Sequence, residues 1–338
     1  MIRTLAFAMA SVLLLSEAGV RGQPAAARRP IIDMHMHAMP ADFYGKAPAT
    51  MCAPQTFPWV DPRDTTADFM TCVGPQIEAG ATDDEVVRRT VAVMTAYNIT
   101  GVISAPLRGG VSPLDRLKPW QAAAPDRVIP GVWSNGSVPL EQLRTWGKAG
   151  RIRVLGELTF QYTGYRFSDA LPEQHFALAE ELDIPVGLHV GPGAPGEAYF
   201  LSARYRAESG RPLALEESLL RHPKMRLYIM HAGWPLADEM LALLFYHPQI
   251  NVDVGIISWQ LPRAEFHRYL KRFIDAGLGK RVMFGSDQLL FHDMIRVAIE
   301  NIEAADFLSA EQKRDIFYNN AARFLRLDQK KPNAADAR

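Results

Sequence analysis

Histidine and acidic side chains recur at the ends of apolar runs in this chain, and their types suit a divalent cation. The stretch IIDMHMH, residues 31–37, ends in His35 and His37. In a β-strand, residues i and i+2 project to the same face, so these two imidazoles point together. Converging neutral imidazoles are common metal ligands. A lone HxH pair is nevertheless weak evidence, because core or surface histidines also bond backbone carbonyls.

Four later apolar runs each end in a further donor: Glu157 in VLGELTF, His189 in PVGLHVG, His231 in LYIMHAGWP and Asp287 in VMFGSDQ. If the runs are parallel strands of one barrel, their carboxyl ends meet at one face. Five or six buried polar groups there would be costly without a compensating cation. The sequence therefore predicts a site for a divalent metal. Zn²⁺ suits these ligands best, with manganese and iron left open.

The elements that would position these donors alternate along the chain. Eight short apolar runs are expected as strands at 30–34, 100–104, 128–133, 154–158, 186–190, 225–230, 250–254 and 282–285. Helical patterns lie between them at 82–97, 114–124, 140–148, 173–182, 213–221, 237–246 and 264–276, and helices fill 293–326. Apolar strands separated by helices favour a parallel sheet buried on both faces.

Eight such units predict an α/β fold, a single (β/α)8 TIM-type barrel, with a long irregular loop of about 45 residues after the first strand. An open doubly wound sheet is the alternative. Against it, no glycine-rich phosphate loop follows the first strand.

Composition is that of an ordinary globular protein, with 338 residues, 48% of them hydrophobic. Lysine plus arginine and aspartate plus glutamate number 37 each, so no basic excess points to nucleic acid or to anionic lipid. The expected partner is a small-molecule substrate, and a homo-oligomer is left open.

The amino-terminal residues 1–22 are predicted to be a signal peptide. A basic start at Arg3 precedes an apolar run from Leu5 to Leu15, which is short for a membrane span. Cleavage is expected after Gly22 or within 25–27, with an uncleaved anchor as the alternative. Export to the periplasm or medium would leave no stable membrane insertion, the barrel at 23–328 and a polar tail at 329–338. In an oxidising compartment, Cys52 and Cys72 can form a disulfide or stay as two thiols.

The ordered set of HxH, His, His and Asp at strand ends, with the closing stretch YNNAARFLRL, resembles the amidohydrolase superfamily and within it the amidohydrolase-related branch. The resemblance covers nearly all of the chain after the leader. It implies one metal on His35, His37 and Asp287, a second on His189 and His231, and Glu157 as the bridge. In relatives with one metal, the sixth-strand histidine is catalytic instead, so His231 has two possible roles and the ion count stays open.

The resemblance implies hydrolysis. A divalent cation activates water and polarises a carbonyl; Asp287 would accept the proton from water and deliver it to the leaving group. With one ion, His231 would be free to polarise the carbonyl. We therefore predict a metal-dependent hydrolase of an ester, lactone or amide. The alternative is a metal-dependent decarboxylase or hydratase of an aromatic-derived acid. The balanced charge and the predicted leader argue against a TatD-like nuclease. The intact set of metal donors argues against a barrel that only binds a ligand.

Side chains on the loops after the strands are candidates for substrate binding. Aromatic rings could form an apolar wall, and an arginine could grip a carboxylate. The alternative for each aromatic ring is packing in the core, and the alternative for each arginine is exposure to solvent. His292, after the eighth strand, could also reach the site. The substrate-binding candidates are Trp59, Tyr162, Tyr165, Arg166, Arg204, Trp234 and Trp259.

Overall fold

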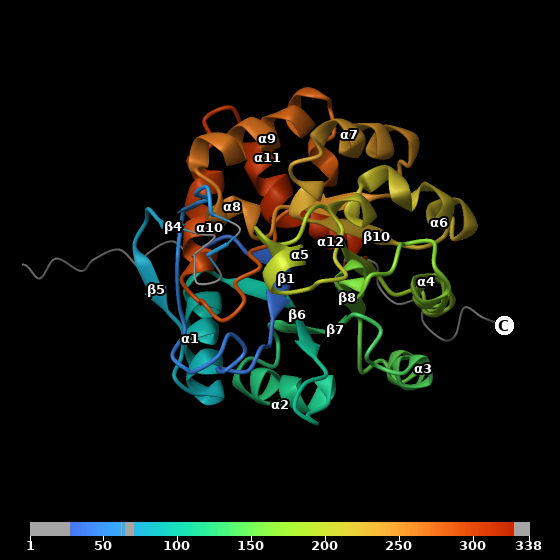
Figure 1. Ribbon diagram of the computed structural model, residues 1–338, viewed down its shortest axis with the longest axis horizontal. Coiled ribbons are helices and arrows are strands. Elements are labelled where there is room, and N and C mark those ends of the chain that lie inside the picture. Colours follow the sequence, from blue (N-terminus) through green and yellow to red (C-terminus); the bar gives the residue numbers. More distant parts are fainter. Residues whose placement is uncertain (1–27, 62, 65–70, 328–338) are drawn as a thin grey trace, which may run out of the picture.

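Eight parallel strands form a nearly closed barrel in the computed structural model, which describes residues 28–61, 63, 64 and 71–327 (Figure 1). The predicted (β/α)8 barrel is confirmed. Neighbours in the barrel follow chain order, as β1-β6-β7-β8-β9-β10-β11-β12. Their bounds are β1 Ile31–His37, β6 Ile99–Pro106, β7 Val128–Ser134, β8 Val154–Leu158, β9 Val186–His189, β10 Leu227–Met230, β11 Asn251–Asp253 and β12 Val282–Met283. The leader and the polar tail predicted from the sequence lie outside the described residues.

Hydrogen bonds join the first strand to the residues that follow the last strand, where the barrel closes. The Met34 N–H donates to the Phe284 carbonyl at 2.9 Å, and the Asp287 N–H donates to the His35 carbonyl at 2.7 Å. The side-chain amide of Gln288 both accepts from the backbone of His37 and donates to it, at 3.0 and 2.8 Å. These contacts bring the segment after β12 against β1.

Helices surround the barrel on the outside and begin close to the predicted positions. Helix α1 starts after Thr82, whose hydroxyl accepts from the Glu85 N–H at 3.2 Å, as the capping pattern predicts. The longer helices are α1 Asp83–Ala96, α2 Pro113–Ala123, α3 Leu140–Lys148, α4 Ala170–Leu182, α7 Ala237–Tyr246, α9 Arg263–Asp275 and α10 Met294–Glu303. The shorter ones are α5 Glu197–Phe200, α6 Glu216–Arg221, α8 Ile257–Gln260, α11 Ala310–Arg314 and α12 Asn320–Phe324. Within the described residues, no helix combines the length and apolarity needed to cross a membrane.

The barrel interior below the site is filled by apolar side chains. Ile32 and Met34 pack there in one cluster with residues of α12, including Phe324. The pairing of β1 with β6 shifts register between Asp33 and Met36. A bulge of this kind re-aims the side chains that follow it. In a regular strand, neighbouring residues point to opposite faces. The bulge therefore allows His35 and His37 to face the interior although Met34, directly before His35, faces it as well.

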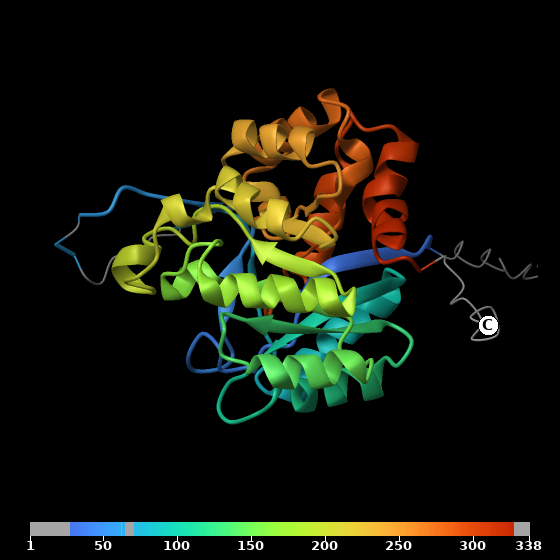
Figure 2. The same ribbon diagram turned by 90° about the vertical axis from the view of Figure 1, so that its right-hand side faces the viewer.

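The loop after β1 is more ordered than the predicted irregular segment. It contains two short antiparallel pairs, of β2 Thr50–Cys52 with β5 Gln76–Glu78 and of β3 Gln55–Thr56 with β4 Thr71–Cys72. Cys52 and Cys72 form a disulfide with a Cα–Cα distance of 5.6 Å. Figure 2 shows this loop and the segment between β9 and α6 projecting from the same end of the barrel.

Candidate metal centre

The first donor group combines both histidines of β1 with the acid after β12. The Nε2 atoms of His35 and His37 lie 3.2 Å apart. The Oδ1 atom of Asp287 lies 3.6 Å from the former and 3.0 Å from the latter. All three side chains are buried. Three donor atoms, two from the first strand and one from the segment after the last strand, thus converge on one point.

A second donor group lies beside the first and comes from β8, β9 and the turn after β10. The Oε1 atom of Glu157 lies 2.7 Å from Nδ1 of His189 and 3.3 Å from Nε2 of His231. The two imidazole nitrogens lie 3.1 Å apart. These residues are also buried, at 6–7% exposure.

Glu157 connects the two groups. Its other oxygen, Oε2, lies 3.7 Å from Nε2 of His35 and 3.5 Å from Nε2 of His37. One carboxylate therefore presents one oxygen to each group. A shared carboxylate of this kind suits two neighbouring cations.

The distances and the buried charge both fit metal binding. Two ligands about 2.0–2.2 Å from one ion at a near-tetrahedral angle lie about 3.3–3.6 Å apart, close to the separations within each group. Among the described residues, no Lys or Arg forms an ion pair with Glu157, Asp253 or Asp287, and Asp287 Oδ1 is a buried atom without a hydrogen-bond partner. Buried carboxylates need compensating positive charge, which a divalent cation supplies.

Contacts on the far side of the rings define which nitrogen faces the centre. Nδ1 of His35 lies 3.3 Å from Oδ2 of Asp253, and Nδ1 of His231 lies 3.1 Å from the carbonyl oxygen of Gly255. Each of these contacts with an acceptor favours a proton on Nδ1, which leaves the Nε2 lone pair for the centre. His189 is turned the other way, with Nε2 at 3.5 Å from the hydroxyl of Tyr162.

The acids of the centre favour the ionised form. Burial raises the pKa of Asp287, but the charge of His35 together with the hydrogen bond and charge of His37 brings that pKa below its usual range. Burial likewise raises the pKa of Glu157, whereas hydrogen bonds from His189 and His231 bring it well below the ordinary value. Both carboxylates can therefore serve as anionic ligands near neutral pH.

Backbone conformation is unusual at two of the donors. His231 and Asp287 have positive φ values of 58° and 49°, and Ala232 follows at 47°. Non-glycine residues rarely adopt this left-handed region, and such strain concentrates at functional sites. The turns after β10 and β12 therefore hold these two side chains in positions that a regular strand would not give.

Of the candidate substrate residues, the structure brings Tyr162 to the centre, through its contact with His189. The ring of Trp259, predicted as a substrate-binding residue, is fully buried, and its Nε1 donates to the Ser286 carbonyl at 2.7 Å. The indole of Trp234 donates to Glu265 on α9. A hydrogen bond from Nε1 thus holds each of the two indoles.

The other candidates lie at the surface. Trp59 is 84% exposed. Tyr165 and Arg204 line a polar surface hollow beside Gly164, and Arg166 is exposed. None of these four has a contact with the donor groups among the described residues. His292 lies outside both donor groups as well.

Two residues that the sequence analysis did not select also belong to the surroundings of the centre. Asp253 ends β11 in NVDVG, the same acid-after-apolar-run pattern that marked Glu157, so it could have been found. Tyr44 comes from the loop after β1, where no pattern marks it. Tyr44 is 48% exposed, and its ring stacks against Phe291, which follows β12. Desolvation of its hydroxyl and the charges of Asp287 and Glu157 raise the pKa of Tyr44.

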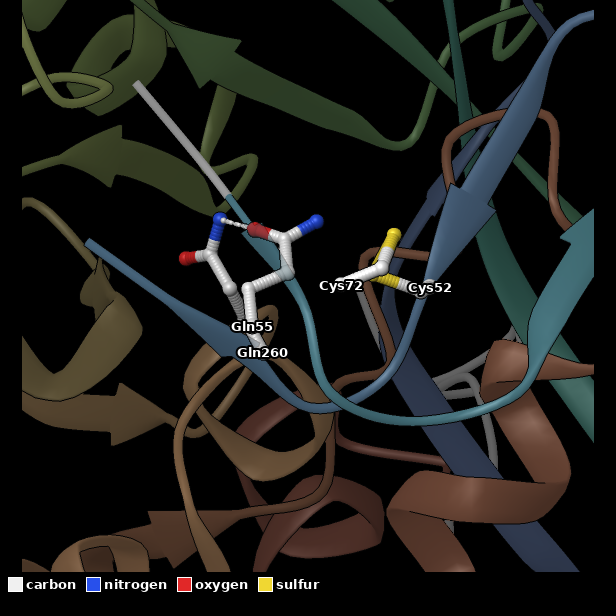
Figure 3. The surroundings of a disulfide bond; sticks show 4 residues. All are labelled: Cys52, Gln55, Cys72 and Gln260. Atoms are coloured by element: carbon white, nitrogen blue, oxygen red, sulfur yellow. Dashed lines mark hydrogen bonds between the residues drawn. A yellow bond between two sulfur atoms is a disulfide. The ribbon is translucent and has the colours of Figure 1, made fainter. Parts of the chain in front are cut away.

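The loop that carries Tyr44 is cross-linked internally by a disulfide and is attached to the barrel by a hydrogen bond. Figure 3 shows the disulfide between Cys52 and Cys72 and, close to it, a hydrogen bond from the Gln260 amide to the Gln55 side-chain oxygen. Gln55 is 2% exposed and Gln260 ends α8, after β11. The loop after β1 is therefore bonded to the segment that follows β11.

Comparison with known proteins gives one family and a set of similar folds. Residues 32–327 match the family model described as "Amidohydrolase". No curated protein matches the chain.

Among solved structures, a probable 2-pyrone-4,6-dicarboxylic acid hydrolase from Acinetobacter baumannii, with citric acid bound, has a TM-score of 0.56 at 15% identity, covering 88% of this chain and 99% of that one. A 2,6-dihydroxybenzoate decarboxylase from Rhizobium has a TM-score of 0.56 at 13% identity, covering 89% and 100%. A dihydroxybenzoic acid decarboxylase from Polaromonas, with bound manganese and an inhibitor, has a TM-score of 0.51 at 14% identity, covering 72% and 86%. At these identities the likeness concerns the fold.

Proposed function

The chain belongs to the amidohydrolase family, and from this premise we propose that it is a metal-dependent hydrolase that cleaves an ester, lactone or amide bond. The observation that carries the proposal is the pair of donor groups that share Glu157. Six side chains from five strand ends converge there, and their buried negative charge lacks a described Lys or Arg partner.

We assign the first ion to His35, His37 and Asp287 and the second to His189 and His231, with Glu157 between them. When bound, a divalent cation lowers the pKa of a coordinated water from 15.7 toward about 7 and polarises a substrate carbonyl. A single ion held by the β1 pair, His189 and Asp287 is the alternative. The second group speaks against it, because Nε2 of His231 faces Glu157 and His189 instead of open space.

Asp287 is the residue we assign to proton transfer. Its ionised carboxylate accepts the proton that water loses as the water oxygen attacks the carbonyl carbon. The same carboxylate then gives this proton to the leaving oxygen or nitrogen as the bond to the carbonyl carbon breaks. The hydroxyl of Tyr162 lies 3.5 Å from Nε2 of His189 and can donate a hydrogen bond to the substrate, because a phenol is protonated at neutral pH.

The candidates for gripping a substrate carboxylate, Arg166 and Arg204, are exposed. A metal-dependent decarboxylase of an aromatic-derived acid is the alternative, because several structures with the same fold are described as decarboxylases of dihydroxybenzoates.

We propose Zn²⁺ as the native ion, with Mn²⁺ as the alternative. Mixed imidazole and carboxylate ligands suit either metal. Manganese is bound in the Polaromonas decarboxylase, which has a similar fold.

We also propose that the protein is exported. The predicted signal peptide at residues 1–22 and the disulfide between Cys52 and Cys72 support an oxidising compartment. Cell fractionation with amino-terminal sequencing of the mature protein tests this. A cytoplasmic protein that begins at Met1 would contradict it.

The test of the main proposal is elemental analysis followed by a substrate panel. Purified protein is assayed on aryl esters, lactones and N-acyl amides, with chelator and after metal is restored, and in parallel for CO₂ release from hydroxybenzoates. We expect metal-dependent hydrolysis and two equivalents of metal. Metal-dependent CO₂ release without any hydrolysis would favour the decarboxylase instead.

A further inference from the structure

A buried carboxylate outside the six assigned ligands contacts both donor groups. Asp253 is fully buried at the end of β11. Its Oδ2 lies 3.3 Å from Nδ1 of His35 in the first group. Its Oδ1 accepts from the backbone N–H of His231 at 3.2 Å and from that of Gly255 at 2.7 Å. The two oxygens therefore serve different halves of the centre.

We propose that Asp253 is a positioning residue that sets both halves of the metal centre at once. This inference rests on the proposed metal-dependent function and adds a residue to it. Through Oδ2, Asp253 holds the proton of His35 on Nδ1. Through Oδ1, it holds the backbone that carries His231.

The contact with His35 selects the tautomer that a metal ligand needs. Nδ1 of His35 and Oδ2 of Asp253 lie 3.3 Å apart, and neither atom has a hydrogen-bond partner among the described residues. A carboxylate at this distance favours a proton on Nδ1 of His35, which keeps the Nε2 lone pair toward His37 and Asp287. Carboxylates in this position fix the ring orientation of a metal-bound histidine and raise its basicity.

The contact with the turn after β10 acts on His231 in two ways. The backbone N–H of His231 belongs to a residue in the left-handed conformation, and Asp253 accepts from it. Asp253 also accepts from the N–H of Gly255, whose carbonyl lies 3.1 Å from Nδ1 of His231. One oxygen atom thus holds both the residue and the group that orients its ring.

Two glycines pack closely against the pair of Asp253 and His35. A Cβ on Gly255 would lie 2.5 Å from Nδ1 of His35 and 3.0 Å from Oδ1 of Asp253. A Cβ on Gly285 would lie 2.9 Å from the Cβ of His35 and 3.0 Å from Cγ of Asp253. Only residues without a side chain fit at both positions.

His35, His231 and Asp253 also bring three donor atoms within 4.8 Å of one another, as ligands of an ion would. The ring nitrogen of His35 that faces each acid separates this arrangement from the positioning role. Asp253 faces Nδ1 of His35, whereas Asp287 and His37 face Nε2 of the same ring. The two nitrogens of an imidazole point in different directions, so one ion cannot take both. Oδ1 is already occupied by two backbone donors.

The test compares two substitutions that remove different parts of the contact. Asp253→Asn keeps an oxygen for the two backbone N–H groups but presents an amide donor to Nδ1 of His35. We expect the affinity of the first site for Zn²⁺ to fall about 10–100-fold, with the second site unchanged. Asp253→Ala removes both contacts, and we expect both affinities to fall.

Asp33→Asn is the matched control. Asp33 is equally buried, and its Oδ1 accepts from the backbone N–H of His35 and of Ser286 at 3.0 and 2.9 Å. An asparagine oxygen can accept the same two bonds, so we expect both zinc affinities to stay within a few-fold of the wild-type values.

Stepwise zinc affinities are measured on metal-free protein by competition with a chromophoric chelator. Long-range ¹H–¹⁵N spectra of the zinc-loaded wild type, with His35 assigned from its loss in His35→Gln, report which ring nitrogen carries the proton. A proton on Nδ1 together with the selective effect of Asp253→Asn supports the inference. Equal affinities in wild type and Asp253→Asn, or a metal-bound Nδ1, would overturn it. Because the variants are compared with wild type, this result is separate from the wild-type stoichiometry, which tests the proposed function.

Discussion

The two donor groups predict how strongly metal stabilises the folded protein. The donors come from strands spread from β1 to β12, so an unfolded chain cannot bring them together. Metal that binds only the folded state raises the free energy of unfolding by RT ln(1 + [M]/Kd) for each site. The dependence of stability on free metal therefore counts the sites.

The expected magnitude follows from the number of groups. At a free metal concentration of 100 Kd, one site contributes about 2.7 kcal/mol and two contribute about 5.4 kcal/mol. Above Kd, each tenfold increase in free metal adds about 1.4 kcal/mol per site. Two sites that share Glu157 thus predict a slope of about 2.8 kcal/mol per decade.

The assay is urea unfolding of the disulfide-intact protein at a series of buffered free Zn²⁺ concentrations. Glu157→Gln removes the negative charge of the bridge and replaces one of its two oxygens with an NH₂ group, so one site keeps a neutral oxygen and the other loses its ligand from residue 157. We expect its slope to fall to about 1.4 kcal/mol per decade. Glu239→Gln is the control, because Glu239 pairs with Arg211 outside the centre, and its slope should match the wild type.

Two results would refute this reasoning. A wild-type slope near 1.4 kcal/mol per decade that Glu157→Gln leaves unchanged would mean one ion and no bridging role for Glu157. A slope of zero would mean that the buried carboxylates bind no metal in the folded state.

Three further predictions concern proton transfer, the loop and a buried indole. Asp287→Asn should lower hydrolysis by about 10²–10⁴-fold, because the proton acceptor is lost; turnover near the wild-type rate, measured with metal content checked by elemental analysis, would contradict the assignment. Replacing Cys52 and Cys72 by serine should cost about 3 kcal/mol in unfolding free energy, from the closure entropy of a loop with sequence separation 20; an unchanged urea midpoint would argue against it. Trp259→Phe should cost about 1–3 kcal/mol of stability through the unpaired Ser286 carbonyl and leave KM unchanged; a raised KM with unchanged stability would support Trp259 as a pocket residue.

The donor set and the barrel were predictable because both follow from local patterns. Apolar runs separated by helical stretches determine a parallel barrel, and the carboxyl end of each strand then has to lie at one face. His35, His37, Glu157, His189 and Asp287 were recognisable because each ends or follows such a run. Asp253 shows the same pattern and could have been recognised by the same rule.

The distances between donors came from the tertiary structure alone. Strand periodicity gives the face of a side chain but not the atom of a partner strand that it meets. The division of Glu157 between two groups, the orientation of each imidazole and the bulge in β1 all depend on contacts between strands distant in the sequence.

The surroundings of the centre were also decided by packing. Trp259 follows a strand as a pocket residue would, yet its position in α8 buries it against Ser286. Tyr44 lies in a long loop with no periodic pattern, and cross-links and short strand pairs determine the path of that loop. The sequence by itself predicted which side chains the two donor groups contain, because the residue types and their order after apolar runs are local features. Only the folded chain decided which residues surround that centre, because loop paths and buried contacts depend on distant parts of the chain.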